Sequence, residues 1–267
     1  MIGIDLDGTL LNNRKLISPK DLNILKSAYE KGIHIAILTG RNEYSTKLYA
    51  DYIGVKSSII ANNGSIIKME NGSTIIIDIE WDKILEVIKC AEILNLHYNL
   101  VTTEQIYYHR KPLKHEIFYG DNDIANHSDV VKYSIIESLE DIKDLDEKAF
   151  KLHILDDNTW RINKFLDKMP YKTDFDMTKT PENQLEICHK DASKGSALKI
   201  IADYYDISSD GIIAIGDSGN DLSMIEFANI GIAMENGMDI IKKKANYITK
   251  SNEENGVYYG IKKFINL

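Results

Sequence analysis

Cysteine and proline are both scarce in this chain of 267 residues. The two cysteines, Cys90 and Cys188, are too few for a disulfide framework and lack the spacing of a metal site. We therefore interpret them as small buried apolar residues in a protein from a reducing compartment. The 4 prolines and the lack of low-complexity tracts argue against long disordered linkers.

Long apolar runs and an excess of basic residues are missing as well. No uninterrupted apolar run approaches the ~20 residues of a membrane-spanning helix. The first apolar stretch contains acids, which a signal peptide does not carry. The net charge of -9 disfavours nucleic acid, whose phosphates need a basic surface, but local groups can still attract a small anionic substrate. We expect a cytoplasmic protein without nucleic-acid or membrane partners; composition leaves its oligomeric state open.

The apolar and polar residues that are present follow a regular order. Hydrophobic residues make up 43% and charged residues 27%, as in an ordinary soluble protein with a sizeable core. Apolar strands are expected at the acid-bearing start, at 34–38 and at 57–61. Helices are expected after Ser18-Pro19 and over about 43–53. Continuous apolar strands alternating with helices are typical of a parallel sheet covered on both faces.

The pattern changes after the third strand and returns near the end of the chain. A hairpin around Asn71-Gly72 leads into short strands and helices of α+β character. Apolar strands at 211–215 and 231–234 then restore the parallel pattern. We therefore predict an α/β fold with a Rossmann-like parallel sheet core, helices on both faces and an inserted α+β domain. The core would comprise residues 1–80 and 189–267, and the inserted domain residues 81–188.

Polar residues follow several of the expected strands. They are Asp5 and Asp7, Thr39-Gly40, Asn63-Gly64, and the group Asp217, Asn220 and Asp221. Ligands of open α/β sheets bind beyond the carboxyl ends of the strands, so these groups are expected to converge. Acids at close range raise one another's pKa values, and Mg²⁺ relieves this because it prefers oxygen ligands. Lys194 and the donors at Thr39-Gly40 add the opposite polarity, which indicates a phosphate site.

The polar motifs, taken together, carry a family resemblance. In chain order they are DLDGTL at 5–10, LTGR at 38–41, NNG at 62–64, SKGSAL at 193–198 and GDSGND at 216–221. This set resembles the haloacid dehalogenase superfamily of phosphohydrolases. The insertion of roughly a hundred residues is similar to that superfamily's large α/β cap of the C2B type. Within the superfamily the chain resembles the Cof-like sugar-phosphate phosphatases, and its ending NGVYYGIKKF does so too.

The resemblance implies a role for each motif residue. Asp5 is expected to be the nucleophile that forms an aspartyl-phosphate. Asp7 is expected to be the general acid and base, which requires a raised pKa. Mg²⁺ is expected on the carboxylates of Asp5 and Asp217 and on the backbone carbonyl of Asp7, while Asp221 orients Lys194 or a metal-bound water. The phosphoryl oxygens are expected to contact Leu6, Thr39, Gly40, Lys194 and Asn220.

Each motif taken alone also has an ordinary structural explanation. An Asp at a strand end is more often a turn or a helix cap than a catalyst, and Asn63-Gly64 alone reads as a plain turn. The ordered set, with each member at an expected sheet end, outweighs these explanations. Arg41 is interpreted as half of a buried ion pair or as a surface residue, and it is left outside the catalytic set. The histidines of the inserted domain lack metal-ligand spacing and are interpreted as satisfied or exposed polar residues.

The motif set leads to one prediction of function and two alternatives. We predict a Mg²⁺-dependent phosphatase that hydrolyses small phosphomonoesters, with sugar phosphates favoured, through an aspartyl-phosphate. Its partner would be a small phosphorylated metabolite, selected by the inserted cap. A phosphosugar mutase is one alternative and a non-catalytic phosphometabolite-binding regulator is another. The presence of Asp7 argues against the regulator, because binding alone needs no acid.

Overall fold

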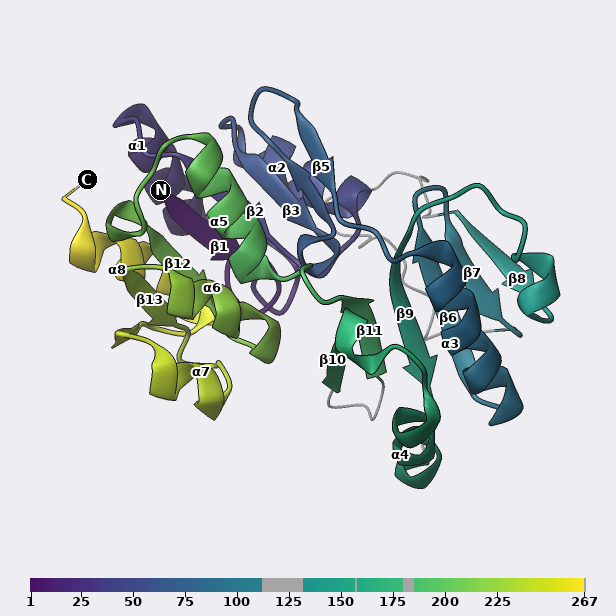
Figure 1. The fold of residues 1–267 in the computed structure, drawn as a ribbon. Helices are drawn as coiled ribbons and strands as arrows, with labels where there is room; N and C mark the ends of the chain where they lie inside the picture. Colours follow the sequence, from purple (N-terminus) through teal and green to yellow (C-terminus); the bar gives the residue numbers. More distant parts are fainter. Residues whose placement is uncertain (112–131, 157, 180–184, 267) are drawn as a thin grey trace. The chain divides into compact units, whose positions relative to one another are not determined.

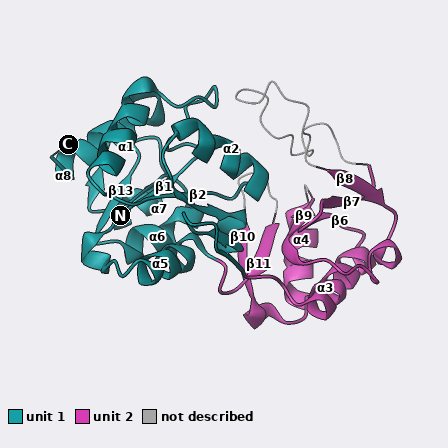
Figure 2. Cartoon of the chain, turned by 90° about the horizontal axis from the view of Figure 1, so that it is seen from above, with its two compact units in different colours: residues 1–76, 121–127, 193–267 teal, residues 77–120, 128–192 magenta. Residues whose placement is uncertain are grey.

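The computed structural model describes residues 1–111, 132–156, 158–179 and 185–266, which form two compact units (Figures 1 and 2). Unit 1 contains residues 1–76 and 193–266, and unit 2 contains residues 77–111, 132–156, 158–179 and 185–192. The boundaries therefore fall at 76/77 and 192/193 instead of the expected 80/81 and 188/189. Ile79 forms a bridge with Ala149, and the Lys190 amide donates to the Asp174 carbonyl, so both connecting segments belong to unit 2.

An eight-stranded sheet forms the centre of unit 1, in the order β14-β13-β12-β1-β2-β3-β4-β5. The parallel strands are β1 (Ile2–Asp5), β2 (Ile35–Leu38), β3 (Ser58–Ala61), β12 (Ile213–Gly216), β13 (Ile230–Ala233) and β14 (Tyr247–Ile248). The strands β4 (Ile66–Lys68) and β5 (Thr74–Ile76) form the predicted antiparallel hairpin at the edge. Every residue of β1, β2, β3 and β12 is buried, which explains their continuous apolar sequences.

Helices cover both faces of this sheet, and the predicted α/β fold is confirmed. The helices are α1 (Pro19–Glu30), α2 (Glu43–Ile53), α5 (Lys194–Tyr204), α6 (Leu222–Phe227), α7 (Asp239–Lys244) and α8 (Gly256–Phe264). Helices α1, α2 and α8 share an apolar cluster with Ile2 and Ile4 of β1. On the other face Gly3 lets α5 approach closely, because a Cβ built there would lie 3.1 Å from the Leu198 side chain.

The first residue of α5 is fixed by a capping box. Ser193 Oγ accepts from the Ser196 amide at 3.1 Å, and Ser196 Oγ accepts from the Ser193 amide at 3.1 Å. This reciprocal pair starts the helix at Lys194. The local sequence SKGS therefore fixes Lys194, the lysine of the fourth motif, as the first residue of α5.

Unit 2 is built on a six-stranded sheet in the order β10-β11-β9-β6-β7-β8. Its strands are β6 (His97–Thr102), β7 (Ile106–His109), β8 (Tyr133–Ile136), β9 (Ala149–Leu155), β10 (Phe175–Lys179) and β11 (Leu185–His189). Neighbouring strands are antiparallel except for the β7–β8 pair. The helices α3 (Trp81–Ile93) and α4 (Thr159–Lys168) share an apolar cluster with one face of the sheet, through residues such as Leu100 and Leu152.

Two further expectations concern cysteines and membranes. Both cysteines are free; Cys188 is buried as expected, whereas Cys90 on α3 is only half-buried. Among the helices in the described part of the chain, none is long and apolar enough to cross a membrane.

Candidate active site

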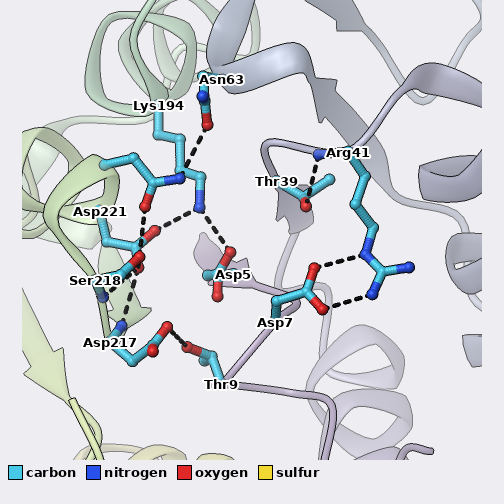
Figure 3. A network of polar contacts seen from close by, with 11 residues as sticks. Asp5, Asp7, Thr9, Thr39, Arg41, Asn63, Lys194, Asp217, Ser218 and Asp221 are labelled. Atoms are coloured by element: carbon cyan, nitrogen blue, oxygen red, sulfur yellow. Dashed lines mark hydrogen bonds and ion pairs between the residues drawn. The ribbon is translucent and has the colours of Figure 1, made fainter. Parts of the chain in front are cut away.

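The carboxyl ends of three neighbouring strands bring the predicted polar residues together (Figure 3). Strand β1 lies between β2 and β12, with Asp5 paired to Leu38 and Ile4 paired to Ile215. Thr39 is the residue that follows β2, and Asp217 is the residue that follows β12. Because the strands are parallel, these two residues emerge on either side of Asp5, at the sheet edge where ligands bind.

Lys194 holds two of the acids at the centre of this site. Its Nζ lies 2.6 Å from Asp5 Oδ1 and 2.6 Å from Asp221 Oδ1, and all three side chains are buried. The other Asp221 oxygen accepts from the amides of Asp217 and Ser218 at 2.9 and 3.0 Å, which fixes its orientation. Two buried carboxylates thus share one ammonium group. This arrangement leaves a surplus negative charge, which is stable in a buried site only when further positive charge or hydrogen-bond donors compensate it.

Burial and neighbouring charges control the pKa values of this group. Burial raises the pKa of Asp5 well above its ordinary value, and the charge of Asp221 raises it further, while Lys194 opposes the change. Burial alone would lower the pKa of Lys194, but the charges of Asp221 and Asp5 raise it above its ordinary value. The lysine is therefore a permanent cation beside Asp5 at neutral pH.

Asp217 lies beside the turn that follows β1. The turn begins at Leu6, which is fully buried and whose carbonyl accepts from the Thr9 amide at 3.3 Å. Thr9 Oγ1 donates to Asp217 Oδ1 at 3.2 Å. Gly8 has a φ of +77°, and a Cβ built there would lie 2.4 Å from Asp217 Oδ2, so only glycine fits. Burial, followed by the charge of Asp221, raises the pKa of Asp217 to about 6.

The donor set fits a hard divalent cation. One carboxylate oxygen from each of Asp5, Asp217 and Asp221 lies within 4.8 Å of the others. Asp5 Oδ2 is buried and has no hydrogen-bond partner among the described residues, a costly state for a carboxylate unless a cation or a ligand completes it. Oxygen donors with surplus negative charge are what Mg²⁺ prefers. The third acid of this cluster is Asp221, which the motifs assigned to orienting Lys194 or a metal-bound water. The expected ligand from Asp7 is its backbone carbonyl, which stays a prediction.

Asp7 is held by two cations (Figure 3 shows the larger one, Arg41). Arg41 donates to its carboxylate from Nε and Nη2 at 2.6 and 2.5 Å, and Lys15 Nζ lies 2.7 Å from Oδ1. Burial alone would raise the pKa of Asp7, but the bonds and charges of Arg41 and Lys15 lower it to about 2. The raised pKa expected for Asp7 is therefore wrong for this arrangement, because both carboxylate oxygens accept from cations.

Arg41 is a side chain of this site that sequence reasoning left outside the catalytic set. It forms the ion pair that was considered for it, and its side chain is 14% exposed. Its guanidinium also donates to Ser45 Oγ at 3.2 Å and lies 5.0 Å from the centre of the Tyr49 ring. The position of Arg41 directly after Thr39-Gly40 was the available signal. Lys15 lies in a polar turn and gave no signal at all.

The predicted phosphate-binding residues occupy the loops around Asp5. Thr39 is buried, and its Oγ1 accepts from the Arg41 amide at 3.2 Å. Asn220 donates from Nδ2 to Asn63 Oδ1 at 2.9 Å, and a Cβ built on Gly40 would lie 3.0 Å from the same oxygen. Asn63 thus links the loops that follow β2, β3 and β12. The NNG motif was the signal for it, since Asn63 has a φ of 57°, which few residues other than Asn and Gly adopt.

A parallel sheet with clustered acids, a buried lysine and hydroxyl and amide donors at its carboxyl edge is typical of phosphoryl-transfer enzymes with α/β folds. The chain belongs to the haloacid dehalogenase-like hydrolase family, whose model matches residues 2–261. The predicted resemblance is thereby confirmed, and the chain is a phosphatase of this family.

Relatives and solved structures are similar over nearly the whole chain. The chain is 31% identical over 287 residues to the 5-amino-6-(5-phospho-D-ribitylamino)uracil phosphatase YwtE of Bacillus subtilis, covering 97% of this chain and 96% of that protein. It is 29% identical over 272 residues to YitU, a phosphatase of the same description and organism, covering 100% and 98%. A solved haloacid dehalogenase-like hydrolase from B. subtilis matches with a TM-score of 0.84 at 26% identity, covering 99% of both chains.

Proposed function

We propose that this phosphatase depends on Mg²⁺ and hydrolyses small phosphomonoesters through an aspartyl-phosphate formed on Asp5. The observation that carries the proposal is the buried Asp5–Lys194–Asp221 group, in which Asp5 Oδ2 has no hydrogen-bond partner in the part of the chain that the structure describes. One Asp5 oxygen is fixed by Lys194 and the other is left for a ligand. A carboxylate oriented in this way is suited to attack, because its geometry is set before the substrate arrives.

The proposed reaction has two steps. In the first, a carboxylate oxygen of Asp5 forms a bond to phosphorus while the bond from phosphorus to the ester oxygen breaks, and the departing oxygen takes a proton from Asp7. In the second, Asp7 removes a proton from water, the water attacks phosphorus, and inorganic phosphate leaves the Asp5 carboxylate. Lys194 offsets charge on the phosphoryl oxygens, and Thr39 and Asn220 supply donors.

The metal site in this proposal uses the clustered carboxylates, whose total negative charge exceeds the single positive charge of Lys194. Asp5 and Asp217 would hold Mg²⁺ with their carboxylates, together with the Asp7 carbonyl. When bound, the cation supplies charge neutralisation for the transferring phosphoryl group. Support comes from the surplus of carboxylates over Lys194 and from the unpaired Asp5 oxygen.

The ion pair on Asp7 constrains the mechanism. A carboxyl group with a pKa of about 2 carries no proton at neutral pH, so Asp7 cannot act as an acid while Arg41 and Lys15 bind it. Proton delivery therefore requires Asp7 to leave these partners once substrate is bound. The arrangement with Arg41 is then a resting form of the acid, and catalytic hydrogen bonds often form only in the complex.

The substrate class that we propose is phosphate esters of sugars or sugar alcohols, with unit 2 as the cap that selects the group released. The inserted position of unit 2 and the family resemblance support this role. Two relatives are named for a phosphorylated ribityl compound, in which a polyhydroxylated chain carries the phosphate.

Release of inorganic phosphate tests this function. Purified protein is assayed on sugar phosphates, sugar-alcohol phosphates and nucleotides, with MgCl₂ and with excess chelator. We expect release only when Mg²⁺ is present, fastest from the polyhydroxylated esters. Formation of an isomerised sugar phosphate with little free phosphate would identify a mutase instead. Release that is unaffected by the chelator would contradict the metal requirement.

A further inference from the structure

The NNG motif at residues 62–64 is the member of the motif set that has no role in the proposed reaction. It forms a buried turn directly after β3. Asn62 and Asn63 both have left-handed backbone conformations, with φ values of 48° and 57°, which asparagine tolerates better than most residues. Polar groups that are buried in such a turn need hydrogen-bond partners, and those partners indicate what the turn does.

The backbone of the NNG turn is tied to the loop that follows β2. The Asn63 amide donates to the Thr39 carbonyl at 3.0 Å, and the Asn62 amide donates to the Arg41 carbonyl at 2.7 Å. A Cβ built on Gly40 would lie 3.0 Å from Asn63 Oδ1, so the two segments also pack closely. The loop that supplies the expected phosphate contacts Thr39 and Gly40 is therefore held by the NNG turn.

The last residue of the turn packs against the start of α5. Gly64 has a φ of +113°, and a Cβ built there would lie 2.5 Å from the Ser193 carbonyl oxygen. Any side chain at this position would push the turn away from Ser193, which caps the helix that begins at Lys194. The NNG turn therefore also limits how far Lys194 lies from the loop that follows β2.

The side chain of the same turn reaches the loop that follows β12 (Figure 3). Asn220 Oδ1 accepts from Ser218 Oγ at 2.6 Å, and Asn220 Nδ2 donates to Asn63 Oδ1 at 2.9 Å. A hydroxyl both donates and accepts, so Ser218 is compatible with either orientation of the Asn220 amide. A carbonyl oxygen only accepts, so Asn63 Oδ1 requires that Nδ2 of Asn220 lies on its side.

We propose that Asn63 is a positioning residue, which fixes the Asn220 amide so that an N–H and not the carbonyl oxygen meets the phosphoryl group. The inference rests on the proposed function, which assigns Asn220 to the phosphoryl oxygens. Nδ2 carries two hydrogens: one goes to Asn63, and the other is the donor for the anion. A reversed amide would present its oxygen to the anion and repel it. Asn63 therefore acts on phosphate through Asn220, without touching it.

Asn63→Gly tests the proposal because it removes the side chain and keeps the left-handed backbone. kcat/KM for p-nitrophenyl phosphate should fall by about tenfold or more, the worth of one hydrogen bond to a charged group. The Kd of inorganic phosphate, measured by isothermal titration in MgCl₂, should rise by a similar factor. Asn255→Gly makes the same change at a φ of 61°, directly before α8, where the side chain forms no capping hydrogen bond. This control should alter neither value.

A double-mutant cycle separates positioning from a general structural role. Asn220→Ala should lower kcat/KM at least as much as Asn63→Gly does. Combined with Asn220→Ala, the change Asn63→Gly should cost little more, because its effect passes through the side chain that is already missing. Additive losses, with kcat/KM falling by the product of the two single factors, would show that Asn63 acts independently of Asn220 and would overturn the proposal.

NMR of the Asn220 side chain gives a readout that does not depend on turnover. In ¹H–¹⁵N spectra this side chain is the NH₂ pair that disappears in Asn220→Ala. Inorganic phosphate should shift the pair in the wild type and leave it nearly unshifted in Asn63→Gly. A wild-type protein that releases phosphate from no ester would contradict the proposed function, and this titration then decides the inference by itself. An equal response in both proteins, including no response in either, would overturn it.

Discussion

At the scale of single residues, the acids Asp5 and Asp7 lie two positions apart in the chain but in opposite surroundings. Burial raises the pKa of Asp5, whereas two cations overcome burial and lower the pKa of Asp7 to about 2. The proposed reaction needs the reverse, an ionised nucleophile and a protonated acid. A cation beside Asp5 lowers its pKa, and release from Arg41 raises that of Asp7. The proposed reaction therefore needs both pKa values to change when metal and substrate bind.

Asp5→Asn should abolish turnover and keep the fold, because an amide does not attack phosphorus. Phosphate release and thermal unfolding are measured on the same preparation, with Asp51→Asn as the control, since Asp51 is exposed on α2 and pairs with Lys47. The control should keep full activity. Retention of more than a small fraction of activity by Asp5→Asn would mean that another group is the nucleophile.

Lys194→Ala should damage both stability and rate. It leaves Asp5 and Asp221 buried without their cation, a loss of about 3–5 kcal/mol in the free energy of unfolding at pH 7. The loss should shrink toward pH 5, because Asp5, whose pKa is already raised by burial, then takes up a proton. At saturating substrate the rate should fall by about a hundredfold. Urea titrations at both pH values and steady-state kinetics measure these effects, with exposed Lys199→Ala on α5 as the control. A change in KM alone would limit Lys194 to substrate binding.

Arg41→Ala should raise the pKa of Asp7 from about 2 toward 3.8, its ordinary value. A folded-state pKa below the unfolded value adds stability above pH 3.8 that disappears as the pH falls toward 2. The variant should therefore be less stable than the wild type at pH 7, and the difference should vanish near pH 2. NMR of the Asp7 carboxyl carbon and denaturant titrations check both effects, with exposed Arg14→Ala as the control. An unchanged Asp7 pKa would assign the shift to Lys15.

At the scale of elements, local sequence patterns predicted the helices and strands better than the contacts between them. The helix expected over about 43–53 spans Glu43–Ile53. Its bounds were predictable because the residues next to it, the N-cap Asn42 and the C-cap Gly54, are local signals for the start and end of a helix. The pair of Asn63 and Asn220 joins residues 157 positions apart, which no local pattern encodes. Nothing in the sequence indicated the burial of Asn99, which is 0% exposed on β6, since it depends on the register of three strands. The positions of the strand ends were predictable from the sequence, whereas the hydrogen-bond partners of the residues at those ends were not.

Gly8→Ala should displace a predicted metal ligand. Gly8 and Gly32 have nearly equal φ values of +77° and +78°, so alanine at either position costs about 1–2 kcal/mol of backbone strain. Only at Gly8 does the added Cβ meet a side chain, Asp217 Oδ2 at 2.4 Å; around Gly32 there is nothing within 4 Å. Isothermal titration with Mg²⁺ should show weakened binding in Gly8→Ala and unchanged binding in Gly32→Ala. Equal affinity in the two variants would argue against Asp217 as a ligand.

At the scale of the whole molecule, the parallel sheet concentrates negative charge at one edge. Asp5 ends β1, Asp217 and Asp221 lie in the segment that follows β12, and of these three acids Asp5 and Asp221 share the buried ammonium group of Lys194. Packing of the helices and strands therefore holds these acids close together in spite of their electrostatic repulsion. A bound cation would offset that repulsion. Because a protein gains stability from any ligand that binds only its folded form, Mg²⁺ should raise the melting temperature.

This gain from Mg²⁺ should depend on pH through Asp217. Its pKa is about 6 in the folded protein and 3.8 ordinarily, so the folded state holds the proton more tightly. Stability without metal should therefore fall as the pH rises from about 4 to about 6, and then level off with respect to this group. Mg²⁺ competes with that proton, so its effect on the melting temperature should be small at pH 5 and full at pH 7.5.

Asp217→Asn should remove the effect and make the metal-free protein more stable than the wild type at pH 7.5. Scans with NaCl at matched ionic strength control for screening; an equal Mg²⁺ shift at both pH values would exclude Asp217 as the group that Mg²⁺ deprotonates.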